Sequence, residues 1–554
     1  MTLIDAHSLP ADETIETEVC IVGSGPAGIT LARELAGQNF RVCLLESGST
    51  HLPTAATQSL SECQSVGDRF QVINAEIRNR QFGGNANLWK IRIGNNQKGV
   101  RYVPLDPIDF EQRDWLPYSG WPFDRTHLQP FYERAQAVCQ IGPFAYEAEA
   151  WEDAQAPQLP FVGNRVTTGM FQFGPGTVFT RDYRDAIDQA SNITTYLNAN
   201  AVELETNETA NTVTRVRVAC LSGNRFWVAA KLVVLAVEGA QLLLVSDQVQ
   251  KTGLGNQNAL VGRFFMDHPY LYGGLFIPND PAIFNSTALY DLRRMNNVAI
   301  MGALKLTDEV LRREQLLNMT ALLLPRHRRF RSKAIASLKT LVASRHHRLG
   351  AKAGLRHLGN VLMGVDDIAI AAYKVLTQQR PVSPTLNNGG WSYLPDKQRR
   401  YQLFEVFHQT EQTPHPDNRL VLSGETDHLG RRKVQLQWRW HDRDIQNIKR
   451  AQTIFAEEIA RAGLGRFHIE RDGDLPIVSN PGTAHHIGMT RMHSDPKQGV
   501  VDEHCQVHGV IASSSVFPTG GYANPTLTII ALAIRLADYV KKVMAHRVTM
   551  LLQN

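Results

Sequence analysis

A glycine-rich turn between an apolar run and a helical segment is the feature that most constrains how this chain folds. The run Val19-Cys20-Ile21-Val22 is short and uninterrupted, which is typical of a strand buried on both faces of a parallel sheet. The sequence Gly-Ser-Gly-Pro-Ala-Gly follows over 23–28, and helical apolar spacing continues to about Gln38. A second apolar run over 41–45 ends in Glu46. This order predicts a strand–helix–strand unit at the start of an α/β fold.

The glycine spacing of this turn predicts a dinucleotide site. The first glycine permits the tight turn, the second lets the backbone approach a pyrophosphate, and the third lets the helix pack on the strand. The free N–H groups at the helix start favour an anion. The carboxylate that ends the second strand lies where it can accept hydrogen bonds from ribose hydroxyls. The expected contacts are Gly23, Ser24, Gly25, Pro26, Ala27, Gly28 and Glu46. This unit alone does not separate FAD from NAD.

Composition excludes several classes of protein. Apolar residues make up 43% and charged residues 20% of the 554 residues, as in a globular chain and unlike a disordered one. The net charge of +5 is too small to indicate a nucleic-acid binder. The six cysteines include no C-x-x-C pair, which predicts thiols in a reducing compartment and no metal site. No secretory leader and no apolar run of membrane-spanning length is visible, so we expect a cytoplasmic protein without a transmembrane segment.

A basic block covers residues 326–356. It contains ten Lys or Arg and no acidic residue, and its apolar residues have helical spacing. A solvated helical insertion is one interpretation of this pattern. A docking face for an acidic partner, an anionic lipid or an acidic substrate is the other.

Two adjacent histidines and a later Asn-Pro pair carry the chemistry that the C-terminal sequence offers. In an extended chain His485 and His486 point to opposite faces, so we expect one of them to enter a pocket. A neutral imidazole is suited to take a hydroxyl proton near neutral pH. Asn524-Pro525 before an apolar helical segment is typical of a helix start, with asparagine as the cap. The alternatives are a structural histidine and an asparagine that only caps the helix.

Five segments together resemble the glucose–methanol–choline (GMC) family of FAD-dependent oxidoreductases. They are the turn at 23–28 with its carboxylate, the Gly-rich loop at 82–89, the stretch at 253–269, the histidine segment at 485–492 and the segment at 520–529. The sequence is most similar to the bacterial branch that has Asn in the second catalytic position and includes sugar oxidoreductases similar to pyranose 2-oxidase.

The resemblance implies a Rossmann-like FAD domain and a discontinuous substrate domain built on an antiparallel sheet. The expected division is a tail at 1–17, an FAD domain at 18–266 and 478–545, a substrate domain at 267–477 with the basic insertion 326–356, and a tail at 546–554.

The resemblance also implies a reaction, the oxidation of the CH–OH group of a sugar, a polyol or another alcohol. His486 falls on the position of the base that accepts the hydroxyl proton while hydride passes to flavin N5, and Asn524 would hydrogen-bond the same oxygen. Further residues implied beside the FAD are Gly83, Gly84, Asn85, Asn87, Leu88, Ala523, Pro525 and Thr526. Members that attach FAD covalently have His at the Leu88 position, so we expect non-covalent FAD. The electron acceptor, whether oxygen, a quinone or a carrier protein, stays open.

The chain departs from the family pattern in two segments that normally approach the cofactor. The turn over 237–241 is about three residues shorter than usual, and the strand over 510–515 is about four residues shorter, with Ser where Gly is common. These departures favour, as an alternative, a GMC-fold protein with impaired or non-redox flavin function, acting by binding or as a lyase. A third alternative is a NAD-dependent dehydrogenase.

Overall fold

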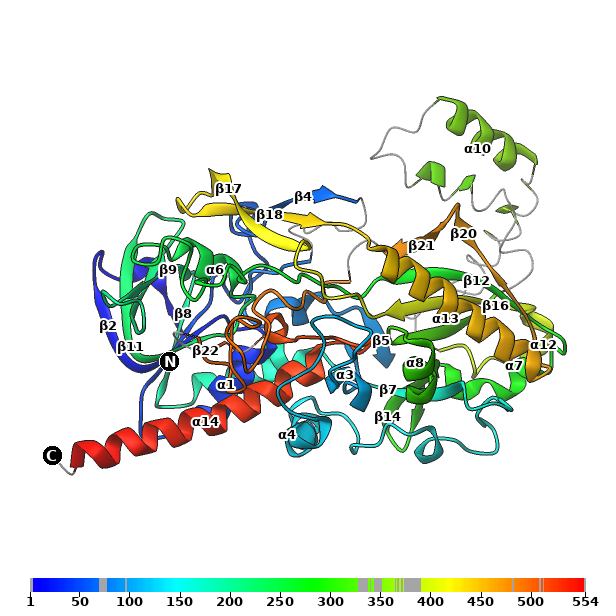
Figure 1. Ribbon diagram of the computed structural model, residues 1–554, viewed down its shortest axis with the longest axis horizontal. Helices are drawn as coiled ribbons and strands as arrows, with labels where there is room; N and C mark the ends of the chain where they lie inside the picture. Colours follow the sequence, from blue (N-terminus) through cyan, green and yellow to red (C-terminus); the bar gives the residue numbers. More distant parts are fainter. Residues whose placement is uncertain are drawn as a thin grey trace.

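The computed structural model describes residues 3–68, 77–94, 97–326, 337–338, 340–342, 351–363, 365, 368–369, 372, 390–480, 483–507, 510–511 and 513–552. Two large sheets lie side by side in these parts of the chain, with helices packed around them (Figure 1).

The first sheet is mainly parallel and contains the predicted strand–helix–strand unit. Its strand order is β1-β8-β3-β2-β11-β10-β9, and β22 also pairs with β11. The bounds are β1 Leu3–Asp5, β2 Thr14–Val22, β3 Val42–Leu45, β8 Ile193–Leu197, β9 Asn200–Thr206, β10 Val213–Ala219, β11 Arg225–Leu235 and β22 Val510–Ile511. Strand β2 pairs in parallel with both β3 and β11, so the glycine turn leaves the middle of the sheet. Helix α1 (Pro26–Leu35) follows the turn and packs against α14 (Thr526–Leu552).

The second sheet is antiparallel in all of its described strand pairs, the edges included. Its order is β20-β21-β12-β16-β15-β14-β7-β6-β5, with β19 on β12 and β13 on β14. The bounds are β5 Ile91–Gly94, β6 Gln97–Tyr102, β7 Val166–Pro175, β12 Tyr270–Pro278, β13 Arg293–Met295, β14 Val298–Leu306, β15 Met319–Arg326, β16 Leu403–Thr410, β19 Gly465–Ile469, β20 Arg471–Asp472 and β21 Leu475–Asn480. Helix α13 (Asp442–Arg461) covers this sheet, and its inner face buries Ile448, Ile454 and Phe455 (Figure 1).

A small third sheet joins segments that are far apart in the sequence. Its order is β17 (Arg419–Thr426), β18 (Arg432–Trp438) and β4 (Cys63–Gly67). Strand β18 alternates with a period of two, because Val434, Leu436 and Trp438 are buried while the residues between them are half-buried. Helix α6 (Ala240–Val245) packs against β17 and β9. The remaining α-helices are α2 Ala55–Ser59, α3 Pro107–Phe110, α4 Arg125–Val138, α5 Tyr183–Asp188, α7 Ile283–Ser286, α8 Asp308–Glu314, α10 Ala351–Met363 and α12 Lys397–Arg400.

The parallel sheet beside a large antiparallel sheet confirms the predicted fold class, but the arrangement differs from the expected division of the chain. The expected tail at 1–17 contains β1 and the start of β2, both paired in the parallel sheet. The expected tail at 546–554 lies largely within α14, which continues to Leu552. Strands β5 to β7 fall within 18–266 yet pair in the antiparallel sheet. Short edge strands and the charged end of a helix carry too little apolar periodicity for the sequence to place them.

Two further expectations concern the basic block and the absence of a transmembrane segment. Most of the basic block 326–356 lies outside the described residues, so its role stays a prediction. Its first residue, Arg326, is buried at the end of β15, where Nε lies 2.7 Å from Oε2 of Glu405. Among the helices that the model describes, none is both long and apolar enough to cross a membrane.

Candidate active site

A cavity of about 840 Å³ lies where the two large sheets meet. The parallel sheet contributes the turns that follow β2, β3 and β11, together with residues 199–201 before and at the start of β9. The antiparallel sheet contributes side chains from β6, β12, β15 and β16. These are Arg101, Tyr270, Leu324, Phe407 and Gln409. Residues 483–486 and the start of α14 complete the wall. The volume of the cavity is in the range of cofactor and ligand sites.

The glycine turn has the shape that a pyrophosphate cradle requires. Gly23 has φ of +100°, a conformation that favours glycine. A Cβ on Gly28 would lie 1.9 Å from the Gly23 carbonyl oxygen, so only glycine lets α1 begin this close to β2. At Gly25, by contrast, a Cβ would meet no atom within 4 Å. The open side of Gly25 faces the cavity at the N-terminus of α1, as expected for a dinucleotide phosphate site.

Glu46 is buried at the end of β3 and lines the same cavity. Its Oε1 accepts from the Gly48 N–H at 2.8 Å, and its Oε2 accepts from the Ser24 N–H at 3.1 Å. The Ser24 hydroxyl also donates to Oε2 and can rotate away. This exchangeable donor leaves Glu46 able to accept a ribose hydroxyl, so the residues present fit FAD.

The Gly-rich loop at 82–89 packs directly on this turn. Gly83, in the left-handed region with φ of +93°, donates its N–H to the Ser24 carbonyl at 2.9 Å. Gly84, Asn85 and Leu88 line the cavity. The Asn87 amide instead donates to the carbonyls of Phe82 and Gly84, so it shapes the loop from within. Three further residues were expected beside the FAD. Of these, Pro525 and Thr526 line the cavity, and Ala523 is buried.

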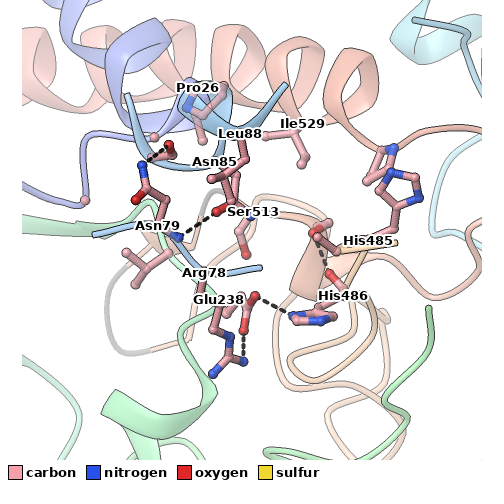
Figure 2. Close-up of a pocket in the computed structure, with 18 of the residues that line it drawn as sticks. Pro26, Arg78, Asn79, Asn85, Leu88, Glu238, His485, His486, Ser513 and Ile529 are labelled. Carbon is pink, nitrogen blue, oxygen red and sulfur yellow. Dashed lines mark hydrogen bonds and ion pairs between the residues drawn. The ribbon is translucent and has the colours of Figure 1, made fainter. Parts of the chain in front are cut away.

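The two adjacent histidines point in different directions (Figure 2), but both line the cavity, whereas the sequence led us to expect only one of them there. His485 Nε2 lies 3.1 Å from Nδ2 of Asn524. His486 instead places Nδ1 2.8 Å from Oε1 of Glu238. The contact with Asn524 is therefore made by His485, and not by the histidine expected from the sequence.

The hydrogen-bond network assigns the tautomer of His485. His268 Nε2 lies 3.2 Å from the Gly520 carbonyl, which can only accept, so this nitrogen is the donor. In neutral His268, Nδ1 is then an acceptor and takes a hydrogen bond from His485 Nδ1 at 3.1 Å. His485 Nε2 consequently carries a lone pair, which faces the Asn524 amide.

The orientation of Asn524 is fixed from the opposite side. Its Oδ1 accepts from Arg101 Nε at 2.9 Å and from Gln409 Nε2 at 3.2 Å. This leaves Nδ2 as the donor toward His485. The side chain is thus held against His485, which lines the cavity, and its described hydrogen bonds are not made to the start of α14.

Burial lowers the pKa of His485 well below its usual value, and the neighbouring His268 and Arg101 lower it further. The imidazole is therefore neutral at physiological pH. A neutral, oriented imidazole beside an amide donor is able to accept a hydroxyl proton and to hold the same oxygen.

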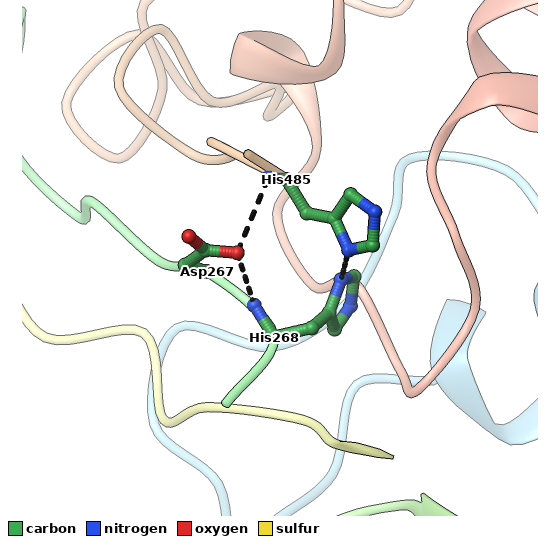
Figure 3. Close-up of side chains that lie close together, drawn as sticks. All are labelled: Asp267, His268 and His485. Atoms are coloured by element: carbon green, nitrogen blue, oxygen red, sulfur yellow. Dashed lines mark hydrogen bonds between the residues drawn. The ribbon is translucent and has the colours of Figure 1, made fainter. Parts of the chain in front are cut away.

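Asp267, His268 and His485 form a cluster (Figure 3). Each offers one potential metal-ligand atom, and these three atoms lie within 4.8 Å of one another. Oδ1 of Asp267 accepts from the backbone N–H of His268 at 2.7 Å and from the backbone N–H of His485 at 3.2 Å. The Thr483 hydroxyl donates to the same oxygen. With Oδ1 committed to these donors and the two imidazoles bonded to each other, the cluster serves to position His485.

Glu238 occupies the shortened turn after β11. It lies between Arg78, with which it forms an ion pair, and His486 (Figure 2). Burial alone would raise the pKa of Glu238, but Arg78 and His486 outweigh it and lower this pKa to about 2. The second shortened segment is retained as the two-residue strand β22, parallel to β11. The cavity therefore persists beside both departures from the family pattern.

Several of these residues were not predicted from the sequence. Asp267 and His268 lie in the stretch 253–269 that carries part of the resemblance, which is a usable signal. Glu238 lies in the shortened turn. Arg101 and Gln409 are single polar residues on strands β6 and β16 and belong to no motif.

A dinucleotide cavity that meets a His–Asn pair is the arrangement of an FAD-dependent oxidoreductase. The GMC oxidoreductase model matches residues 414–533, and the FAD binding domain model matches residues 16–63. The chain belongs to the GMC oxidoreductase family and carries an FAD-binding domain.

Two relatives and one solved structure are similar to this chain. A 2-methyl-1,2-propanediol dehydrogenase from Mycolicibacterium austroafricanum is 22% identical, with 95% of both chains covered. A C-glycoside 3-oxidase from Arthrobacter globiformis is 35% identical over 20% of this chain and 21% of its own. An FAD-dependent oxidoreductase from Chaetomium thermophilum shares the fold, with a TM-score of 0.50 and 15% identity over 96% of this chain and 100% of that one.

The two glycines of the turn yield opposite expectations. Gly28→Ala should destabilise the apoprotein by about 1–3 kcal/mol, because its Cβ clashes with the Gly23 carbonyl. Gly25→Ala should leave the apoprotein melting temperature unchanged yet weaken FAD binding, because its Cβ enters the phosphate space. Thermal melts of apoprotein and fluorescence titration with FAD measure the two effects. Wild-type FAD affinity in Gly25→Ala would contradict the placement of the pyrophosphate.

Proposed function

We propose that this GMC oxidoreductase oxidises the CH–OH group of a small-molecule alcohol, with His485 as the base and Asn524 as its partner. The observation that carries the proposal is the 3.1 Å contact between His485 Nε2 and Asn524 Nδ2 at the wall of the FAD cavity. A substrate hydroxyl that replaces this direct hydrogen bond would give its proton to Nε2 and accept a hydrogen bond from the amide. When bound, FAD supplies the acceptor, at N5, for the hydride that leaves the carbinol carbon.

His486, the base expected from the sequence, is less suited to this role. Its Nδ1 is held by Glu238, and its Nε2 is buried with no hydrogen-bond partner in the described part of the chain. We therefore assign it to the ion pair of Glu238 and Arg78 at the cavity wall. The dehydrogenase relative, named for a diol, supports an alcohol substrate. A sugar or polyol substrate, as in the branch similar to pyranose 2-oxidase, stays part of the proposal, as does a cytoplasmic location.

FAD should be bound without a covalent link. Leu88, at the position where a histidine would attach the flavin, lines the cavity with an aliphatic side chain that cannot form the bond. We expect purified protein to show an oxidised-flavin absorption band that passes into the supernatant after acid precipitation. A band that stays with the pellet would contradict non-covalent binding. A colourless protein that takes up no added FAD would favour the alternative of a GMC-fold protein without redox function.

His485→Ala should slow flavin reduction by an alcohol by about a hundredfold or more, the range for loss of a general base, and should retain FAD. His486→Ala is the matched variant, because it removes the neighbouring imidazole and leaves the contact with Asn524 intact. Anaerobic stopped-flow absorbance measures both rates. A large loss in His486→Ala with near wild-type reduction in His485→Ala would return the role of base to His486.

The lowered pKa of His485 predicts how the reaction rate depends on pH. Because its pKa is lowered, the base stays unprotonated as the pH falls past 6.5, the usual value for histidine. The rate of flavin reduction by a neutral alcohol should therefore stay level through that pH and fall only in more acidic buffer. Arg101→Gln removes a neighbouring positive charge, so it should raise the pKa and shift the fall toward higher pH. A wild-type midpoint near 6.5 would contradict this environment for His485.

A further inference from the structure

We propose that helix α10 (Ala351–Met363) is a membrane-surface helix, which attaches this protein to a bilayer containing anionic lipid by laying an exposed apolar face among the lipid headgroups. The inference does not depend on the proposed function, because no residue of α10 lines the FAD cavity.

The apolar face of α10 is formed by leucines that lie in contact with water. The exposed fraction is 69% for Leu355, 49% for Leu358 and 68% for Leu362, which together we call the leucine face. Met363, at the end of the helix, is 83% exposed. The exposed large apolar residues of the other described segments are separated along the sequence, as is normal for a protein surface. An apolar face this concentrated indicates a binding surface.

The leucine face points away from the part of the chain that holds α10. Its three residues have the spacing i, i+3 and i+7, so they lie in one stripe along the helix. Another side of the helix carries His357 and Asn360, whose Nδ1 and Nδ2 lie 3.1 and 3.0 Å from Oγ of the buried Ser337. Figure 1 shows α10 standing apart from the two large sheets. A flat surface can therefore approach the leucine face.

Helix α10 gains little stability from its own sequence. It has 13 residues, a length at which an isolated helix is marginal in water. Gly354 and Gly359 weaken it further, because glycine is a poor helix former. A Cβ at either position would meet no atom within 4 Å, so packing requires neither glycine. A partner that buries the leucine face would stabilise the helix.

The charge of the surrounding sequence favours an anionic surface. Between Glu314 and Asp366 the chain has no acidic residue. The basic block ends within α10, where it contributes Lys352 and the exposed Arg356. Seven further Lys or Arg lie in the segment 327–350 that directly precedes the helix. Basic residues beside an apolar helix face attract anionic headgroups, so this combination is typical of an interfacial helix.

A bilayer suits the leucine face better than a protein partner does. The binding energy of protein interfaces is concentrated in aromatic and arginine anchors, whereas α10 contains no Phe, Tyr or Trp. The face is aliphatic and stands on a projecting helix, which can be lowered onto a plane (Figure 1). The helix is about 20 Å long, too short to cross the hydrocarbon core, so it lies along the surface.

Co-sedimentation of the purified full chain with vesicles tests the inference. The probes are vesicles of phosphatidylcholine alone, and vesicles of phosphatidylcholine and phosphatidylglycerol in about equal amounts. The test variant replaces the leucine face by Leu355→Gln, Leu358→Gln and Leu362→Gln. The matched control replaces three exposed apolar residues of other segments by Leu52→Gln, Val162→Gln and Val249→Gln. Arg356→Gln tests the contribution of charge.

Wild-type protein and the matched control should sediment with the anionic vesicles and remain in solution with the neutral ones. The test variant should bind the anionic vesicles about tenfold more weakly or less, because its three side chains no longer gain by leaving water. Arg356→Gln should weaken binding about twofold to fivefold, and added salt should weaken wild-type binding. Amide hydrogen exchange over 351–363 should slow on anionic vesicles in the wild type and stay unchanged in the test variant.

Absence of wild-type binding to anionic vesicles would overturn the inference, as would undiminished binding of the test variant or an equal loss in the matched control. Equal binding to neutral and anionic vesicles would overturn the selection of anionic lipid. If the leucine face instead binds a second copy, analytical ultracentrifugation should show a dimer that the test variant lacks, without vesicle binding. If the test variant melts below the wild type, Leu358→Gln alone and hydrogen exchange of the wild type still decide.

Discussion

A line of hydrogen bonds from the Gly520 carbonyl to Arg101 governs the chemistry that this protein can perform. The carbonyl fixes the proton on His268, His268 fixes the proton on His485, and Arg101 and Gln409 fix the amide of Asn524. Each member leaves its neighbour a single consistent role as donor or acceptor. The outcome is an unprotonated Nε2 facing an N–H donor, and burial with nearby cations keeps that imidazole neutral. This is an oriented base prepared before any substrate arrives.

The two sheets have separate tasks around this line. The parallel sheet supplies the glycine turn and Glu46, which form a cradle for the dinucleotide. The antiparallel sheet supplies Arg101 and Gln409 from near the ends of β6 and β16, where extended backbone holds side chains rigidly. The segment 483–486 crosses between them and is pinned by Asp267. The proposed catalytic pair of His485 and Asn524 thus lies where the two sheets meet.

Electrostatic pairing distinguishes the two kinds of arginine in the cavity. Arg78, Arg326 and Arg431 each meet a carboxylate, which returns most of the cost of burying them. Arg101 meets only neutral amides and an aromatic ring. A buried cation without a counter-ion costs free energy of folding, and the hydrogen bonds from Arg101 to Asn524 and Gln409 offset part of that cost. In the shortened turn after β11 the buried charge is paired, because Glu238 contacts both Arg78 and His486.

The sequence by itself determined the parts that depend on neighbouring residues. The glycine spacing at 23–28 and the apolar runs of β2 and β3 are local signals, and each is confirmed as the element it predicts. Only the tertiary structure decided which of two adjacent histidines meets Asn524, and which polar side chains from the antiparallel sheet join them. Arg101 and Asn524 are 423 residues apart, and Arg113 and Glu411, an ion pair buried nearby, are 298 apart. Contacts of that span are set by how the sheets pack, and no periodicity within a strand encodes them.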